Sequence, residues 1–165
     1  MPDKNVSDIV NAIRGRVPDK AIPWIVAQSA TETQTKQGPW TSNIFKTLNN
    51  GFGMLHPRQR KTTSIGPGSK QPGSEGGGSY ATYNSFSDSA KDLLLYFDAR
   101  KVNWDEIDNA TEYVAWLKSK GYFGAPEKDY RSSVLRYLKN IKIPTPMPLI
   151  GVALFAIGIL YYLKK

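Results

Sequence analysis

Residues 22–33 read IPWIVAQSATET, and this stretch sets the expectations for the whole fold. Pro23 suits the first turn of a helix, because its missing N–H is one that a helix start leaves unpaired anyway. The residues that follow are almost all apolar or small, and Glu32 comes near the end of the run. We therefore predict a helix that ends at about Thr33 and carries a carboxyl group at the edge of an apolar surface.

Glu32 is the candidate for catalytic chemistry. An apolar setting disfavours the charged form of a carboxyl group, so it raises the pKa and lets the group act as a general acid near neutral pH. Its position at a helix end would equally suit a surface glutamate. The motifs around Glu32 must therefore decide between the two interpretations.

Two motifs follow this helix in order. Residues 38–42 read GPWTS and residues 49–54 read NNGFGM. Together with AQSATET at residues 27–33, they resemble the family of bacterial and phage N-acetylglucosaminidases that includes the flagellar-rod peptidoglycan hydrolases. That family has an Ala-Gln-Ala-x-x-Glu-Ser helix end, then Gly-x-Trp-x-Ser and Asn-x-Phe-Gly. Beside the helix end, the matching positions are Trp40, Ser42, Asn50, Phe52 and Gly53.

Two later segments continue the resemblance. Residues 80–89, YATYNSFSDS, are similar to the family's Phe-Arg-x-Tyr-x-Ser segment. Residues 121–126, GYFGAP, together with Tyr130 look like its Gly-Tyr-Ala-Thr-Asp-Pro-x-Tyr segment. The likeness thus runs over about residues 22–141. The first segment lacks the usual arginine and the second lacks the Thr-Asp pair, as expected of a divergent member.

The resemblance implies an α+β, mostly helical lysozyme-like domain with a small β insert. It also implies cleavage of peptidoglycan glycan strands, by an endo-glycosidase or a lytic transglycosylase. Glu32 is then the catalytic acid, and Tyr83 is the positional match of a tyrosine that assists catalysis in the family. We expect a substrate groove lined by Trp40, Ser42, Asn50, Gly51, Phe52, Tyr80 and Tyr122.

A second carboxylate is expected if the reaction is hydrolysis. In the family it lies in the β insert, and Glu75 is the only acidic residue between Met54 and Tyr83. Glu75 is therefore the candidate partner of Glu32. If no partner exists, the substrate's own groups complete the reaction, as in lytic transglycosylases.

The pattern of caps and apolar residues predicts further helices. Ser85 with Asp88 and Asn109 with Glu112 have the spacing of capping boxes, and another helix is expected from about Pro126. Residues 54–83 break the helical pattern and are rich in Gly, Ser and Pro, which favours a loop-rich insert with a short strand pair. We expect one catalytic domain over residues 1–143.

The last part of the chain differs in composition. A Pro-rich linker is predicted at residues 144–148, and residues 147–163 are seventeen positions without a charge. This is close to the length of a membrane-spanning helix, and Lys164 and Lys165 follow it. The expected fold class is therefore completed by a single C-terminal transmembrane helix. Because the N-terminus shows no secretory signal, we expect an anchor in the internal membrane of a phage particle, or otherwise in a bacterial envelope.

Composition limits the other possibilities. The net charge is +8 and the pI about 9.6, which favours polyanionic partners, and there is no cysteine for a disulfide or a Cys-based zinc site. His56 is the single histidine, so we expect no metal and no cofactor. The expected partners are peptidoglycan, the lipid membrane and other virion proteins, and no nucleic-acid motif is present. Two alternatives stay open: a lysozyme-like cell-wall-binding module without activity, and a structural membrane protein of a virion.

Overall fold

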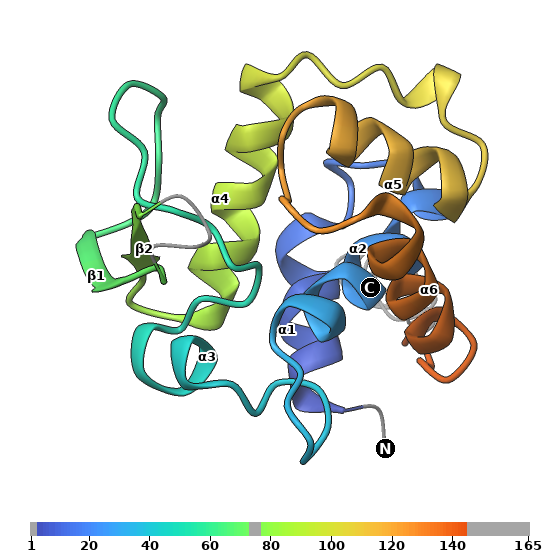
Figure 1. The fold of residues 1–165 in the computed structure, drawn as a ribbon. Helices are drawn as coiled ribbons and strands as arrows, with labels where there is room; N and C mark the ends of the chain where they lie inside the picture. Colours follow the sequence, from blue (N-terminus) through green and yellow to red (C-terminus); the bar gives the residue numbers. More distant parts are fainter. Residues whose placement is uncertain (1–2, 73–76, 145–165) are drawn as a thin grey trace, which may run out of the picture.

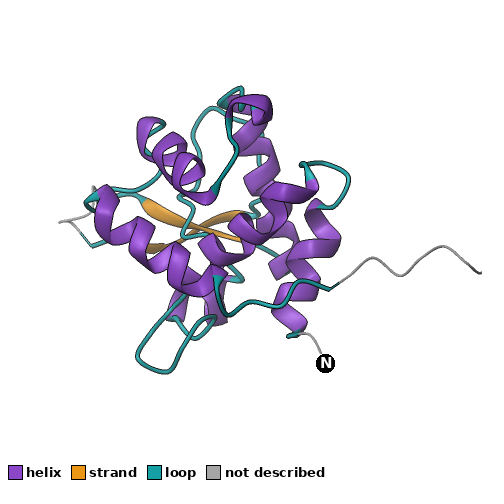
Figure 2. Ribbon diagram, turned by 90° about the vertical axis from the view of Figure 1, so that its right-hand side faces the viewer, coloured by secondary structure: helices purple, strands orange, loops and turns teal. Residues whose placement is uncertain are grey.

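The computed structural model describes residues 3–72 and 77–144. About half of these residues lie in helices. The sheet in this part of the chain is one two-stranded antiparallel hairpin. Figure 1 shows the hairpin with its loops on one side and most of the helices on the other. In Figure 2, turned by 90°, the two strands appear in the middle of the view with helices around them. The described residues therefore form an α+β fold that is mostly helical.

The fold class needs one correction. Among the described residues, no helix is long and apolar enough to cross a membrane. The segment assigned to the transmembrane helix, residues 147–163, lies outside the described residues. The predicted class with a transmembrane helix is therefore wrong, and the class is α+β with a two-stranded sheet.

Helix α1 (Lys4–Ile13) begins at an aspartate cap. The Asp3 carboxylate accepts a hydrogen bond from the Asn5 backbone N–H at 2.7 Å, so Asp3 caps the helix. Its apolar residues form one buried stripe that packs against α4.

Helix α2 (Ile22–Glu32) follows the short 3-10 helix η1 (Asp19–Ala21) and is the central element of the core. Nearly every residue of α2 is buried, and the helix packs against α6 and α1. A helix without a polar face must be covered on all sides. Burial along the helix leaves its last residue, Glu32, at the border between the core and a cleft.

Helix α3 (Asn43–Leu48) starts at Ser42, whose hydroxyl accepts from the Phe45 N–H. It packs against strand β2 (Ser79–Thr82), which pairs with β1 (Gly66–Lys70) in the antiparallel hairpin. The register shifts between Pro67 and Lys70, where proline lacks a backbone donor. The structure thus has a strand pair within residues 54–83.

Helix α4 (Phe86–Ala99) has the predicted cap: the Ser85 hydroxyl accepts from the Asp88 N–H at 3.1 Å. The 3-10 helix η3 (Trp104–Glu106) leads to α5 (Ala110–Ser119), which is capped by Asn109 as expected. Helix α6 (Glu127–Leu138) then closes the domain against α2 and α5. Figure 1 shows α4 between the hairpin on one side and the helical part on the other.

Candidate active site

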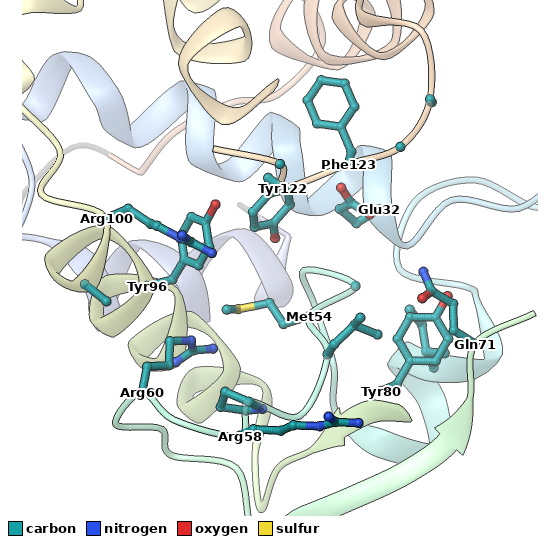
Figure 3. Close-up of a pocket in the computed structure, with 18 of the residues that line it drawn as sticks. Glu32, Met54, Arg58, Arg60, Gln71, Tyr80, Tyr96, Arg100, Tyr122 and Phe123 are labelled. Carbon is teal, nitrogen blue, oxygen red and sulfur yellow. The ribbon is translucent and has the colours of Figure 1, made fainter. Parts of the chain in front are cut away.

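A large cleft opens between the helical part and the insert. Its volume is about 1450 Å³, and its lining comes from the end of α2, the loops of the insert, the end of α4 and the loop before α6. Figure 3 shows Glu32 and Phe123 on one side of the cleft, Met54 in the middle, and arginines on the other side. Segments that are far apart in the sequence therefore build one site.

Glu32 is half-buried and lines one side of this cleft. The Tyr130 hydroxyl donates a hydrogen bond to Glu32 Oε1 at 2.6 Å. The backbone of Gly53 approaches the other oxygen so closely that a Cβ atom on Gly53 would lie 2.7 Å from Glu32 Oε2. The carboxyl group is therefore held by a neighbour on each side.

The loop before α6 fixes the tyrosine that binds Glu32. The ring of Phe123 stacks on that of Tyr130 with centroids 3.8 Å apart. The Lys118 ammonium group donates to the carbonyl of Ala125 at 2.8 Å and lies 5.1 Å from the Phe123 ring centroid. These contacts anchor the loop against the end of α5.

Two tyrosines near Glu32 stay protonated. Burial, and then the charge of Glu32, raise the pKa of both Tyr122 and Tyr130 well above the usual range. Each hydroxyl therefore acts as a neutral donor: Tyr130 donates to Glu32, and Tyr122 donates to the backbone carbonyl of Phe52 at 2.6 Å. The second bond ties the loop before α6 to the turn that follows α3.

A buried ion pair attaches the insert to α4. Arg60 donates to both carboxylate oxygens of Asp92 at 2.7 Å, and Tyr83 donates to Asp92 Oδ2 at 2.7 Å. Burial alone would raise the pKa of Asp92, but the hydrogen bonds from Arg60 and Tyr83 lower it below its usual range. The Asp92 side chain is fully buried as a carboxylate, and Arg60 reaches the cleft from the other side of this pair.

The structure brings some of the predicted site residues together. Tyr80 and Tyr122 line the same cleft as Glu32. Asn50 is buried, and its side-chain amide donates to the carbonyls of Met54 and Ala81. It therefore holds the turn that carries Gly53 against β2, and does not face the cleft.

Gly51 and Phe52 belong to the same turn. A Cβ atom on Gly51 would overlap the ring of Phe86, and the Gly51 carbonyl accepts from the Ser29 hydroxyl at 2.7 Å. Only a glycine allows the turn to pack so closely on α4. The Phe52 side chain is buried in the core, and its carbonyl is the acceptor for Tyr122.

Three predicted residues lie away from the cleft. Trp40 is buried, and its indole N–H donates to the Ser29 hydroxyl at 3.1 Å. Ser42 caps α3, and Tyr83 is buried against Asp92. Their local contacts are those of packing and capping residues. Glu75 lies outside the described residues.

Several residues that line the cleft were not assigned to the groove from the sequence. They are Gly53, Tyr96, Arg100, Phe123 and Tyr130. Gly53, Phe123 and Tyr130 had a signal, because they lie in segments that the resemblance covered. Tyr96 and Arg100 reach the cleft through the packing of α4, which no local pattern encodes. The described residues contain no group of three or more His, Cys, Asp or Glu side chains placed to hold a metal ion.

The fold resembles one solved structure at low sequence identity. One chain of a type VI secretion system effector-immunity complex from Pseudomonas protegens superposes on this chain with a TM-score of 0.53. The match covers 84% of this chain and 94% of that chain at 17% identity, so it shows a shared fold. No family model and no curated protein matches the sequence.

The expected location changes together with the fold class. The internal membrane of a phage particle was inferred from a transmembrane helix, and no helix of the described part could cross a membrane. The predicted membrane and phage setting is therefore wrong.

Proposed function

We propose that this chain cleaves the glycan strands of peptidoglycan as a lysozyme-like enzyme, with Glu32 as the general acid. The observation that carries the proposal is the position of Glu32. Its carboxyl group ends a buried helix, faces a cleft of about 1450 Å³, and is contacted by Tyr130 and Gly53. The motifs that resemble the N-acetylglucosaminidase family point to the same residue.

The chemistry follows from this geometry. Cleavage of a glycosidic bond requires a proton for the leaving oxygen. Tyr130 donates to Oε1 of Glu32, and Oε2 lies beside the turn at Gly53. Tyr80, Tyr122 and Phe123 offer aromatic surfaces along the cleft, and such surfaces suit the apolar faces of sugar rings.

The route after protonation depends on a second group. Glu32 is the one carboxylate among the described residues that line the cleft, and Glu75 lies outside the described residues. A hydrolysis with Glu75 as partner and a transglycosylation with Glu32 alone both fit these observations. The end groups of the products distinguish the routes, because transglycosylation yields an anhydro sugar.

The structural neighbour supports a protein partner. It was solved as a complex of an effector with an immunity protein. We extend the proposal accordingly: this chain acts on the cell wall as an effector, and a dedicated protein binds it. The predicted partner peptidoglycan is retained as the substrate.

The test uses the full chain, its Glu32→Gln variant and a control, Glu106→Gln. Glu106 is exposed in η3 and does not line the cleft. Each protein is incubated with purified peptidoglycan of several types, and the released fragments are read by mass spectrometry. We expect fragments from the parent and from the control and none from Glu32→Gln. A well-folded parent that binds peptidoglycan but releases nothing would instead establish a binding module.

A further inference from the structure

Three arginines line the cleft on the side away from Glu32. We refer to Arg58, Arg60 and Arg100 as the basic wall. Arg58 and Arg60 come from the insert, and Arg100 comes from the end of α4. Figure 3 shows Met54 between Glu32 and this wall. The cleft thus has an acidic side and a basic side.

The three guanidinium groups are not equivalent. Arg60 is bound in bidentate fashion by the buried Asp92, so the charge of Arg60 is compensated. Arg58 and Arg100 are exposed, and neither forms an ion pair with a carboxylate among the described residues. The guanidinium carbon of Arg100 lies 5.5 Å from the ring centroid of Tyr96, which is buried. Arg100 is therefore positioned, charged and open to a ligand.

Solubility alone does not explain why Arg58 and Arg100 line the cleft. A cation at the C-terminal end of α4 is favourable for the helix dipole, but Arg100 is also held over an aromatic ring that lines the cleft. Arg58 lies in an irregular loop and is not part of a helix. Two cations from different segments, neither of them in an ion pair among the described residues, face one cleft. Planar guanidinium groups match carboxylates in geometry and charge.

We propose that Arg58 and Arg100 recognise carboxylates carried by the glycan strand. This inference rests on the proposed function, because it assigns the occupant of the same cleft. In peptidoglycan the carboxylates come from two sources: the stem peptides, or the lactyl groups of sugars that have lost their peptide. The cleft accordingly binds acidic cell-wall strands in preference to neutral polymers of N-acetylglucosamine.

The experiment measures binding in the Glu32→Gln background, so that substrate is not consumed. Three probes of equal sugar number are titrated by calorimetry: peptide-bearing glycan fragments, the same fragments after amidase treatment, and neutral chitin oligosaccharide. The test variant adds Arg58→Gln and Arg100→Gln. A control variant adds Lys36→Gln and Lys128→Gln, which remove the same charge from exposed positions outside the cleft.

We expect at least one acidic probe to bind more tightly than chitin oligosaccharide. Each arginine should contribute between about threefold and tenfold in affinity, as a hydrogen bond to a charged group does after solvent screening. The arginine variant should lose this preference and keep its affinity for chitin oligosaccharide, and the lysine control should keep the preference. Tighter binding of the peptide-bearing probe would identify the stem peptides, and tighter binding of the amidase-treated probe would identify the lactyl groups.

Two outcomes would overturn the inference. One is equal binding of acidic and neutral probes by the Glu32→Gln chain that keeps its arginines. The other is an equal loss of affinity for all three probes in the arginine variant. Failure of the proposed function is a separate result. It would be seen when the unmodified chain releases no fragments from peptidoglycan, whichever probe the Glu32→Gln chain prefers to bind.

Discussion

The contact between Gly53 and Glu32 allows the site to be tested without altering the acid itself. Gly53 has a φ of +62°, and a Cβ atom added there would lie 2.7 Å from Glu32 Oε2. Ordinary van der Waals contact begins at 3.4 Å. In Gly53→Ala the carboxyl group must therefore move by about 0.7 Å or the turn must shift.

The expected magnitudes separate stability from activity. An alanine in the left-handed region costs about 1–2 kcal/mol of unfolding free energy. A misplacement of about 1 Å at a reacting group reduces the rate by up to about 100-fold. The displaced carboxyl group would also lose its 2.6 Å hydrogen bond from Tyr130. We expect Gly53→Ala to be about 10- to 100-fold less active than the parent chain.

Gly15→Ala is the matched control. Gly15 has a φ of +75°, and a Cβ atom there would meet nothing within 4 Å. The control therefore carries the same backbone strain and leaves Glu32 untouched. Urea unfolding gives the stability of each variant, and fragment release from peptidoglycan gives its activity under conditions where the protein is folded. The reasoning would be refuted if the two variants released fragments at rates within about twofold of each other.

Two further substitutions test the surroundings of the acid. Tyr130→Phe removes the donor to Glu32, so we expect a loss of about 1 kcal/mol in unfolding free energy and a clear loss of fragment release. The control Tyr137→Phe, on the same helix, should keep full activity. Equal activity of the two variants would speak against a positioning role for Tyr130. Asp92→Asn breaks the buried pair with Arg60, at a cost of about 3 kcal/mol of unfolding free energy. Because the pKa of Asp92 is lowered in the folded protein, its contribution is complete above the ordinary aspartate value of about 4 and is lost as the pH falls through the lowered value. Urea unfolding between about pH 7 and pH 2 should thus show a flatter acid limb for the variant, and parallel limbs would contradict this assignment.

The sequence predicted the helical part well, because caps and apolar runs are local signals. Ser85 and Asn109 cap α4 and α5 as expected, and α2 ends at Glu32. The transmembrane helix was inferred from composition alone, and no such helix occurs in residues 3–72 or 77–144.

Some of the residues predicted for the site line the cleft, and others are buried inside the domain. Glu32, Tyr80 and Tyr122 line one cleft. Trp40 and Asn50 come from motifs near the acid, yet their polar atoms bind Ser29, Met54 and Ala81 inside the domain. A motif groups residues that belong to one structural feature. It does not separate the residues that face a ligand from those that hold the turn.

By itself, the sequence determined the helix that ends at Glu32, because Pro23 and the apolar run after it are local signals for a helix. Only the tertiary structure decided what surrounds the acid. Tyr130 is 98 residues away from Glu32 along the chain, and their hydrogen bond exists because α6 packs on α2. Arg60 likewise reaches the cleft because Asp92 of α4 holds it there. Such pairs depend on distances between elements, which are fixed by the packing of the whole core.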